Sequence, residues 1–267
     1  MRGSVKLIIL GDVVAKIGRQ AVADVLPRWG KKYKADAVIA NVENLAHGKG
    51  ITKKTLAELK EAGVAAFTGG NHLWRKHDPA SDDIRGEFSV ACPANDPRTI
   101  PPLRWQTIKT KGGTLFILSL EGQLAMHDEG LTSPFIAFDS LYAEMGTPKM
   151  LIVDLHAELT SEKGAFGHYT DGRASVVYGT HTHIPTADTR ILPDGTGFIT
   201  DVGMTGSDDS VLGVEKHIIM KRFLGEKQTF EYPEQGPAWI NAIFCELDPK
   251  TGHCTMIEQL QEKLIIK

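Results

Sequence analysis

Short apolar runs alternate with amphipathic segments along the first part of the chain. Residues 5–10, 37–41 and 65–68 are apolar runs of strand length, so each predicts a buried strand. Residues 19–32 and 52–62 lie between these runs and carry apolar side chains at helical spacing. An order of strand, helix, strand, helix and strand predicts parallel strands joined by right-handed crossovers.

Local signals indicate how the two helices begin and end. Thr52 has the side chain of a good N-cap, and Gly63 stands where a glycine commonly follows the last helical turn. Pro27 lies inside the earlier helical segment, where it lacks a backbone N–H and crowds the preceding turn. We therefore expect Pro27 to bend or break that helix.

The middle of the chain has a different pattern. Extended segments separated by proline-rich or Lys-Gly-Gly turns are typical of antiparallel strands, and we expect them at residues 88–91, 103–110 and 114–120. This section predicts a second sheet. Further strands are expected at residues 150–155, 174–179 and 197–200, helices at 135–145 and 215–224, and a hairpin of residues 240–247 and 254–260.

Length and composition favour one globular domain. A chain of 267 residues can bury a large core, and no linker-like or charged block divides it, so we expect a single domain over residues 1–267. There are 30 basic and 33 acidic residues, which give a formal charge of -3. This balance argues against duplex DNA or an anionic membrane as a partner, so a phosphate-bearing substrate must be held by local groups.

The cysteine content and the absence of long apolar runs indicate a cytoplasmic protein. Cys92, Cys245 and Cys254 form no CxxC pair and suggest no disulfide framework, which fits a reducing compartment. Asp12 interrupts the N-terminal apolar run, which does not have the pattern of an export signal. No stretch approaches the ~18 apolar residues of a membrane helix. None of these features decides the oligomeric state, and a homo-oligomer is compatible with all of them.

Polar residues with metal-binding side chains follow five of the predicted strands. Ligands gather at the carboxyl ends of parallel strands, so these side chains should converge on one cleft. Their order along the chain predicts a hydrolase with two metal ions. The motifs are GD, NVEN, GGNH, LHAE and GTHTH, and the candidate residues are Asp12, Glu43, Asn44, Asn71, His72, His156, His181 and His183.

Each motif also has a structural interpretation. Asp12 could cap the next helix, NVEN and GGNH could be polar turns, and a single strand histidine such as His156 is usually a hydrogen-bonded core residue. GTHTH is more specific, because histidines two positions apart in an extended chain project from one side and can bind one cation or a pair. Together the motifs point to metal more strongly than any one of them.

The order of these motifs resembles the metallophosphoesterase (calcineurin-like) superfamily. The segments GDVVAKIGR, NVENLAHGKG, GGNHLW, DLHAELTSEK, YTDGRASVVYGTHTHIPTAD and ITDVGMTG are more closely similar to the YmdB-type phosphodiesterases, a bacterial family tied to cyclic nucleotide hydrolysis. The resemblance runs from Lys6 to about Phe223. It implies an α/β sandwich in which two mixed sheets are flanked by helices in four layers.

The resemblance also implies a role for each candidate residue. Two cations ~3.5–4 Å apart would clamp a phosphoryl group and lower the pKa of a bridging water, with His72 as general acid. The ligands include no thiolate, which suits iron, manganese or zinc, and the family suggests iron or manganese. The implied ligands of one cation are Asp12, Glu43, Asn44 and His183, and those of the other are Glu43, Asn71, His156 and His181.

The chain departs from the general superfamily pattern at two places. Val14 stands where a histidine is usual, and Glu43 followed by Asn44 replaces a bridging aspartate. The YmdB-type pattern shares both changes, and Asn44 is well placed to replace the lost imidazole. Against that narrower pattern, Leu73 and Arg75 stand where a threonine and an aspartate are expected. These two positions bear on the shape of the substrate site and not on the metals.

Several further residues have weaker signals. Asp154 and Asp201 could orient metal-binding imidazoles, with strand-end capping as an equal alternative. His168 and Arg173 lie in a Gly-rich segment that could line the cleft, although a plain loop is favoured, and Trp74 could cover a base. Histidines without ligand spacing are expected at the surface, namely His47, His77, His127, His168, His217 and His253.

We expect a binuclear-metal phosphodiesterase that hydrolyses a small phosphodiester such as a 2',3'-cyclic nucleotide. Phosphomonoesterase activity is one alternative. Another is a two-metal hydrolase of amides or lactams, since a pair of histidines also serves those enzymes. A third is a regulatory or RNA-associated protein that binds a nucleotide with incidental turnover. Motifs of other enzyme classes, such as GxSxG, Walker A, GxGxxG and HExxH, are absent from the sequence.

Overall fold

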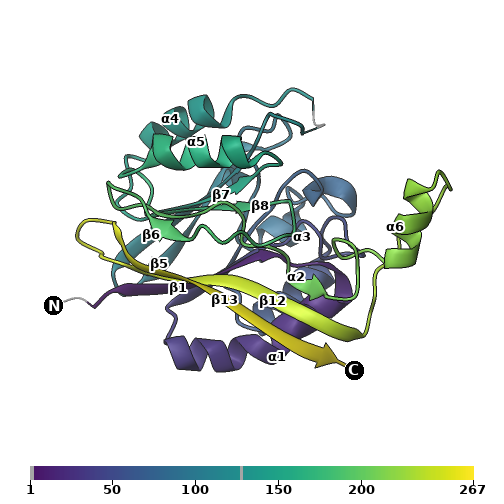
Figure 1. Ribbon diagram of the computed structural model, residues 1–267. Coiled ribbons are helices and arrows are strands. Elements are labelled where there is room, and N and C mark those ends of the chain that lie inside the picture. Colours follow the sequence, from purple (N-terminus) through teal and green to yellow (C-terminus); the bar gives the residue numbers. More distant parts are fainter. Residues whose placement is uncertain (1–2, 127–128) are drawn as a thin grey trace.

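Two mixed β-sheets pack face to face in the computed structural model, which describes residues 3–126 and 129–267 (Figure 1). Helices cover the outer face of each sheet, so the described chain has four layers. The predicted α/β sandwich is therefore confirmed. His127, which was expected at the surface, lies outside the described residues.

The first sheet joins the N-terminal strands to the C-terminal hairpin. The N-terminal strands are mutually parallel, as predicted, and the hairpin pairs antiparallel with the first of them. The sheet order is β11 (Gly206–Ser207), β12 (Gly236–Leu247), β1 (Val5–Asp12), β2 (Ala37–Asn41), β3 (Ala66–Thr68) and β4 (Val90–Ala91), with β13 (Cys254–Ile266) beside β12.

The second sheet comes from the middle of the chain and is also mixed. Its first two strands form an antiparallel hairpin, its central strands are parallel, and its last pair is antiparallel. The sheet order is β5 (Trp105–Thr110), β6 (Gly113–Glu121), β7 (Leu151–His156), β8 (Val176–Thr180), β10 (Gly197–Ile199) and β9 (Arg190–Ile191).

The helices divide between the two outer faces, except for α6, which stands away from the body (Figure 1). α1 (Ala15–Tyr33) and α2 (Lys53–Glu61) pack on the first sheet. α4 (Pro134–Glu144) and α5 (Thr160–Thr170) pack on the second. The remaining helical segments are α3 (Asp82–Arg85), α6 (Lys216–Phe223) and the 3-10 turns Leu73–Arg75 and Pro101–Leu103.

Alternating side chains bury both faces of the first sheet. Ile9 and Ile39 pack between the two sheets, whereas Ile8 and Val38 pack against α1 and α2. This alternation follows from the two-residue period of a strand, and it explains why these strands read as continuous apolar runs. Full burial of each such side chain contributes about 1.5–3 kcal/mol, so the layers hold the strand ends in fixed positions.

The predicted ends of α2 are confirmed. Thr52 accepts a hydrogen bond from the backbone N–H of Thr55, and the Thr55 hydroxyl accepts one from the Thr52 backbone N–H, which completes a capping box. Gly63 follows the helix with a φ of 106°, a conformation that favours glycine.

Pro27 was predicted to bend or break the first helix, and the predicted break is wrong. α1 runs through Pro27 from Ala15 to Tyr33. Pro27 and Ala23, whose carbonyl loses its helical partner, both lie on the exposed face. Water can satisfy that carbonyl, while Val22 and Leu26 are buried on the opposite face and hold the helix against the sheet.

The Gly-rich segment with His168 and Arg173 was expected to be a loop, but most of it belongs to α5. Gly167 allows this helix to approach the sheet closely, because a Cβ there would lie 2.5 Å from the ring of Phe198. Glycine thus marks close packing here rather than a flexible loop. Sequence spacing alone could not distinguish these alternatives.

Two other predictions need correction. Residues 88–91 were assigned to an antiparallel section, but β4 pairs parallel with β3 in the first sheet. The antiparallel prediction is correct for β5 and β6. The C-terminal hairpin exists but is longer than predicted. β12 begins at Gly236, before the predicted residue 240, and β13 ends at Ile266, beyond the predicted residue 260. Within the described ranges, no helix is long and apolar enough to cross a membrane.

Candidate metal centre

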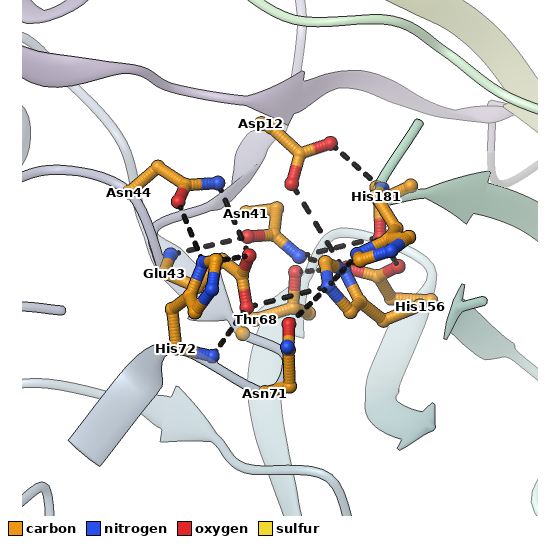
Figure 2. Close-up of polar contacts among 12 residues, drawn as sticks. Asp12, Asn41, Glu43, Asn44, Thr68, Asn71, His72, His156 and His181 are labelled. Carbon is orange, nitrogen blue, oxygen red and sulfur yellow. Dashed lines mark hydrogen bonds and ion pairs between the residues drawn. The ribbon is translucent and has the colours of Figure 1, made fainter. Parts of the chain in front are cut away.

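The candidate residues lie together where strands of both sheets end, and Figure 2 labels all of them except His183. Asp12 ends β1, Glu43 and Asn44 follow β2, and Asn71 follows β3. On the second sheet, His156 ends β7, and His181 and His183 follow β8. Parallel strands direct their carboxyl ends to the same side, which explains why distant segments meet here.

One half of the centre surrounds a single nitrogen of His156. Its Nε2 lies 3.3 Å from Oε2 of Glu43, 3.2 Å from Oδ1 of Asn71 and 3.1 Å from Nδ1 of His181 (Figure 2). The ligand atoms of Glu43, His156 and His181 all lie within 4.8 Å of one another. Imidazole nitrogens and carboxylate oxygens this close form a donor set suited to a transition-metal cation.

The other half lies beside Glu43. Asn44 Nδ2 donates to Oε1 of Glu43 at 3.1 Å and lies 3.3 Å from Nε2 of His183. Asp12 Oδ2 accepts the backbone N–H of His181 at 3.0 Å. Asp12 therefore does not cap α1, whose N-cap position is Val14 and has no side-chain cap. Glu43 lies between both halves and contacts residues of each.

Asp12 carries the clearest sign that a cation fits this centre. The residue is fully buried, and its Oδ1 has no hydrogen-bond partner in the described part of the chain. A buried carboxylate oxygen without a donor is costly, and such an atom calls for an ion or an ordered water. Nδ1 of His156 lies 3.9 Å from this oxygen, beyond hydrogen-bond distance. The residues present thus fit a bound cation.

Hydrogen bonds to the outer ring nitrogens orient the three imidazoles. Nδ1 of His156 lies 2.9 Å from the Thr180 hydroxyl, which itself donates to Asp154 at 2.7 Å, so Nδ1 donates to that hydroxyl and Nε2 is the nitrogen left to bind a cation. His183 Nδ1 lies 3.0 Å from the carbonyl of Leu212, which leaves Nε2 free. Each ring thereby directs its other nitrogen to the centre, where that nitrogen can bind a cation once it has lost its proton.

His181 receives its orientation from Glu158, a residue that the sequence analysis missed. Oε2 of Glu158 lies 3.2 Å from Nε2 of His181, so the opposite nitrogen, Nδ1, faces the centre. Thr180 was missed as well. Both flank predicted ligands, since Glu158 lies two positions after His156 and Thr180 directly precedes His181. Proximity in sequence was therefore the available signal.

Asp154 and Asp201 support the imidazoles indirectly. Asp154 accepts from Thr180, from Thr68 at 2.5 Å and from Asn41 at 3.0 Å, so it acts on His156 through the Thr180 hydroxyl. Asp201 accepts the backbone N–H and hydroxyl of Thr182, the residue between the two histidines of GTHTH. Neither carboxylate contacts a metal-binding ring directly among the described contacts.

A buried ion pair holds the GTHTH segment in a strained shape. His181 and His183 have φ values of 94° and 67°, in a region that side chains rarely adopt. Lys163 donates to Oδ2 of Asp201 at 2.7 Å and to the Thr180 carbonyl at 2.7 Å. Since Asp201 also holds Thr182, this pair fixes the backbone that presents both histidines.

Charge and burial shift the pKa values at the centre in different directions. Burial lowers the pKa of His156, but Glu43, Asp12 and Asp154 together outweigh it and raise that pKa to about 10. Burial and the neighbouring His156 lower the pKa of His181 to about 3. Burial would raise the pKa of Glu43, yet His156 and His72 hold it well below its usual value.

Gly70 shows how closely the strand ends approach one another. A Cβ at this position would lie 2.1 Å from Cδ2 of the His156 ring. Only glycine leaves room for the imidazole, which explains the second glycine of GGNH by close approach rather than by turn geometry alone. Gly70 is not among the described glycines that have a positive φ.

His72 lies at the edge of the centre with part of its ring accessible. Its Nδ1 lies 3.2 Å from Oδ1 of Asn44 and 3.3 Å from Oε1 of Glu43, and its side chain is 25% exposed. Its backbone N–H donates to Oε2 of Glu43 at 2.9 Å. The ring also lines a cavity of about 500 Å³ in front of the centre, together with Asn44 and His183.

The weaker candidates lie elsewhere or are otherwise engaged. His168 is exposed on α5, and Arg173 pairs with Asp139 at 2.6 Å, so neither lines the cleft. The ring of Trp74 is covered by the guanidinium of Arg98 at 4.1 Å from its centroid. His47, His217 and His253 are exposed, as expected, whereas His77 is half-buried and lies 3.1 Å from Asp83.

Comparisons with known proteins show which family this chain resembles over nearly its whole length. The family model described as "YmdB-like protein" matches residues 8–260. A 2',3'-cyclic-nucleotide 2'-phosphodiesterase of Bacillus subtilis (strain 168) is 40% identical over 257 residues, which cover 96% of each protein.

Two solved structures are similar over nearly the whole chain. A novel phosphatase of Mycoplasma pneumoniae aligns with a TM-score of 0.91 and 34% identity, covering 100% of this chain and 95% of its own. A hypothetical protein from Thermus thermophilus aligns with a TM-score of 0.87 and 36% identity, covering 97% and 99%. These identities are high enough to support shared family membership as well as a shared fold.

Proposed function

Because this chain belongs to the YmdB-like family, we propose that it is a metal-dependent phosphodiesterase that hydrolyses small phosphodiesters, 2',3'-cyclic nucleotides among them. The observation that carries the proposal is the cluster of buried Glu43, buried His156 and half-buried His181, beside the Asp12 oxygen that has no hydrogen-bond partner within the described chain. A whole-length relative named for this reaction supports the choice of substrate class.

We assign the cluster to two cations that share Glu43. When bound, such ions neutralise charge on phosphoryl oxygens and lower the pKa of a coordinated water. Donor chemistry without thiolate suits iron, manganese or zinc, and the family resemblance favours iron or manganese. The proposed ligands of one cation are Asp12, Glu43, Asn44 and His183, and those of the other are Glu43, Asn71, His156 and His181.

Asn44 needs one adjustment to serve as a ligand. Its amide nitrogen now faces Glu43 and His183, and its oxygen faces His72. A half-turn of the amide exchanges the two atoms and presents the oxygen to the centre, while Nδ1 of His72 keeps Oε1 of Glu43, 3.3 Å away, as the acceptor for its proton. Asn44 thereby supplies the neutral ligand that replaces the histidine absent at Val14.

His72 is proposed as the general acid. Its ring is held from one side by Asn44 and Glu43, and it lines the cavity in which the substrate would lie. From this position the imidazole can donate a proton to the leaving oxygen while Glu43 and Asn44 fix its orientation.

The Cys92, Cys245 and Cys254 thiols are free and buried, which is consistent with our proposal of a reducing cytoplasmic setting.

Hydrolysis assays test this function directly. We expect the manganese-loaded or iron-loaded protein to hydrolyse bis-p-nitrophenyl phosphate and a 2',3'-cyclic nucleotide, and to leave amide and lactam substrates intact. His156→Ala should lose metal and activity together, whereas His168→Ala, an exposed histidine on α5, should retain both. Amide hydrolysis without phosphodiester hydrolysis would overturn the proposal.

Phosphomonoesterase activity is a second candidate, because a structural relative bears the name phosphatase. A comparison of kcat/KM for p-nitrophenyl phosphate and its bis ester separates the two. Tight metal-dependent nucleotide binding with negligible turnover of either ester would instead favour a regulatory role.

A further inference from the structure

A basic pocket adjoins the cavity in front of the metal centre. The cavity of about 500 Å³ that reaches Asn44, His72 and His183 shares part of its wall with a second cavity of about 440 Å³. The second cavity extends away from the proposed ligands. The two cavities have in common Lys49, Arg222, Phe230 and Tyr232.

The second cavity is lined by positive side chains without a compensating negative one. Lys49, Arg75, Lys76 and Arg222 all contribute to its wall, and no carboxylate does. None of these four forms an ion pair within the described ranges of the chain. Lys49 and Arg222 instead lie over the ring of Phe230, at 5.6 Å and 5.1 Å from its centroid. Like charges gathered in this way attract an anion.

Close packing holds the loop that carries Lys49 against two other chain segments. Gly48 has a φ of 72°, and a Cβ there would lie 1.9 Å from the Tyr232 ring. A Cβ at Gly50 would lie 2.8 Å from the backbone nitrogen of Lys76. The loop that carries Lys49 is therefore in contact with both neighbouring segments. The segment GKG (residues 48–50) is too short to cradle a phosphate alone, and the fold brings further cations next to it.

The first cavity has an apolar wall between this pocket and the metal centre. Val214, Ile219 and Phe223 line it together with Phe230 and Tyr232. Phe223 is 87% exposed, although it belongs to the aromatic residues that usually lie inside a protein. Exposed aromatic rings next to cations suit a nucleobase, which stacks on the rings while its phosphates meet the charges.

His47 also lines the basic pocket, but it is not part of the proposed site. Glu234 interacts electrostatically with His47, and it is paired with Lys16 at 2.7 Å. That side of the pocket is therefore already balanced by a carboxylate.

We infer that this basic pocket binds a second phosphate group of the substrate, so that the preferred substrate is a nucleotide carrying a phosphate besides the reacting diester. The second group is either a 5'-phosphate or the next internucleotide linkage of an oligonucleotide. The inference rests on the proposed function, because it places the reacting phosphate at the metal centre. Arg75 adds a positive charge to this pocket, at a position where the family pattern has a negatively charged aspartate.

Equilibrium binding tests the inference without requiring turnover. The probes are adenosine 3'-monophosphate, adenosine 3',5'-bisphosphate, and the adenosine dinucleotide with a 3'-phosphate, each titrated into manganese-loaded protein by calorimetry. We expect at least one of the two larger probes to bind about tenfold tighter than the monophosphate. The larger probe that binds more tightly identifies the source of the second phosphate.

Matched variants assign the gain to the pocket. Arg75→Gln and Lys49→Gln should each reduce the gain to within about twofold of the monophosphate, whereas Lys31→Gln, an exposed lysine on α1, should leave it intact. Melting temperatures check that the variants fold. The inference is overturned if neither larger probe binds more tightly than the monophosphate. It is also overturned if the tighter binding persists in both pocket variants. Failure of hydrolysis alone would count against the proposed function and not against this site.

Discussion

His72 differs from the proposed ligands because its ring lines the open cavity while its Nδ1 is held by Asn44 and Glu43. If it is the general acid, His72→Ala should lower kcat by about 10²- to 10⁴-fold while metal content stays unchanged. Steady-state kinetics with bis-p-nitrophenyl phosphate and elemental analysis of the same sample provide the measurement.

The control for this variant is the metal content itself. His72 also touches Glu43 through its backbone N–H, a contact that alanine retains. If the alanine variant loses a metal ion, His72 must be reassigned as a ligand.

His156 leads to a prediction about protons. Carboxylates around the ring raise its pKa to about 10 in the metal-free protein, so at neutral pH the ring is protonated. A ligand must give up that proton, and so metal loading should release about one proton per His156 and bind more tightly as pH rises toward that value. Calorimetry of manganese binding in buffers of different ionisation enthalpy measures the release.

The sign of the effect can be checked with a variant. In His156→Gln the titrating ring is absent, so proton release on any residual binding should fall. An affinity that is independent of pH between about 6 and 9 in the unmodified protein would contradict this prediction.

At the level of elements, the site depends on how closely strand ends and loops approach. Gly70→Ala should push the His156 ring aside, because the new Cβ would lie 2.1 Å from it. We expect metal affinity to fall by about tenfold to a hundredfold, the range typical when the positioning of a ligand is disturbed. Titration with manganese measures the change.

Gly164→Ala is the matched control. Gly164 lies inside α5, and no atom is within 4 Å of the position a Cβ would occupy. Alanine there should preserve metal affinity and stabilise the protein by about 0.5–1 kcal/mol through helix propensity. Equal metal affinity in both variants would argue against close packing at Gly70.

At the level of the whole molecule, the C-terminal hairpin completes the first sheet. β12 pairs with β1 through six residue pairs from Val5 to Leu10, and β13 covers its other edge. We propose that the chain therefore folds as one unit. A chain ending at residue 235 would expose the apolar edge of β1, and we expect it to aggregate. Size-exclusion chromatography and circular dichroism would show this.

Deletion of β13 alone is the informative comparison. A chain ending at residue 247 keeps β12 beside β1, so it should retain more native structure than the shorter chain. A folded monomer formed by residues 1–235 would show instead that the N-terminal part is an independent unit.

The sequence by itself determined the layered α/β architecture and most of the strands. Continuous apolar runs such as residues 7–10 are typical of strands buried on both faces, and the two histidines of GTHTH at a strand end are not typical core residues. The candidate ligands could be identified from the sequence because each of them stands near the end of a predicted strand, where an apolar run gives way to polar residues.

Only the tertiary structure decided which groups meet. The pairing of Glu158 with His181 and the relay from Asp154 through Thr180 are contacts between segments brought together by packing. Packing likewise places Lys49 and Arg75 in the wall of one cavity. Spacing along a chain encodes the face of one helix or strand, which is a local property. Distances between separate segments depend on how the sheets and loops pack, and no local pattern contains them.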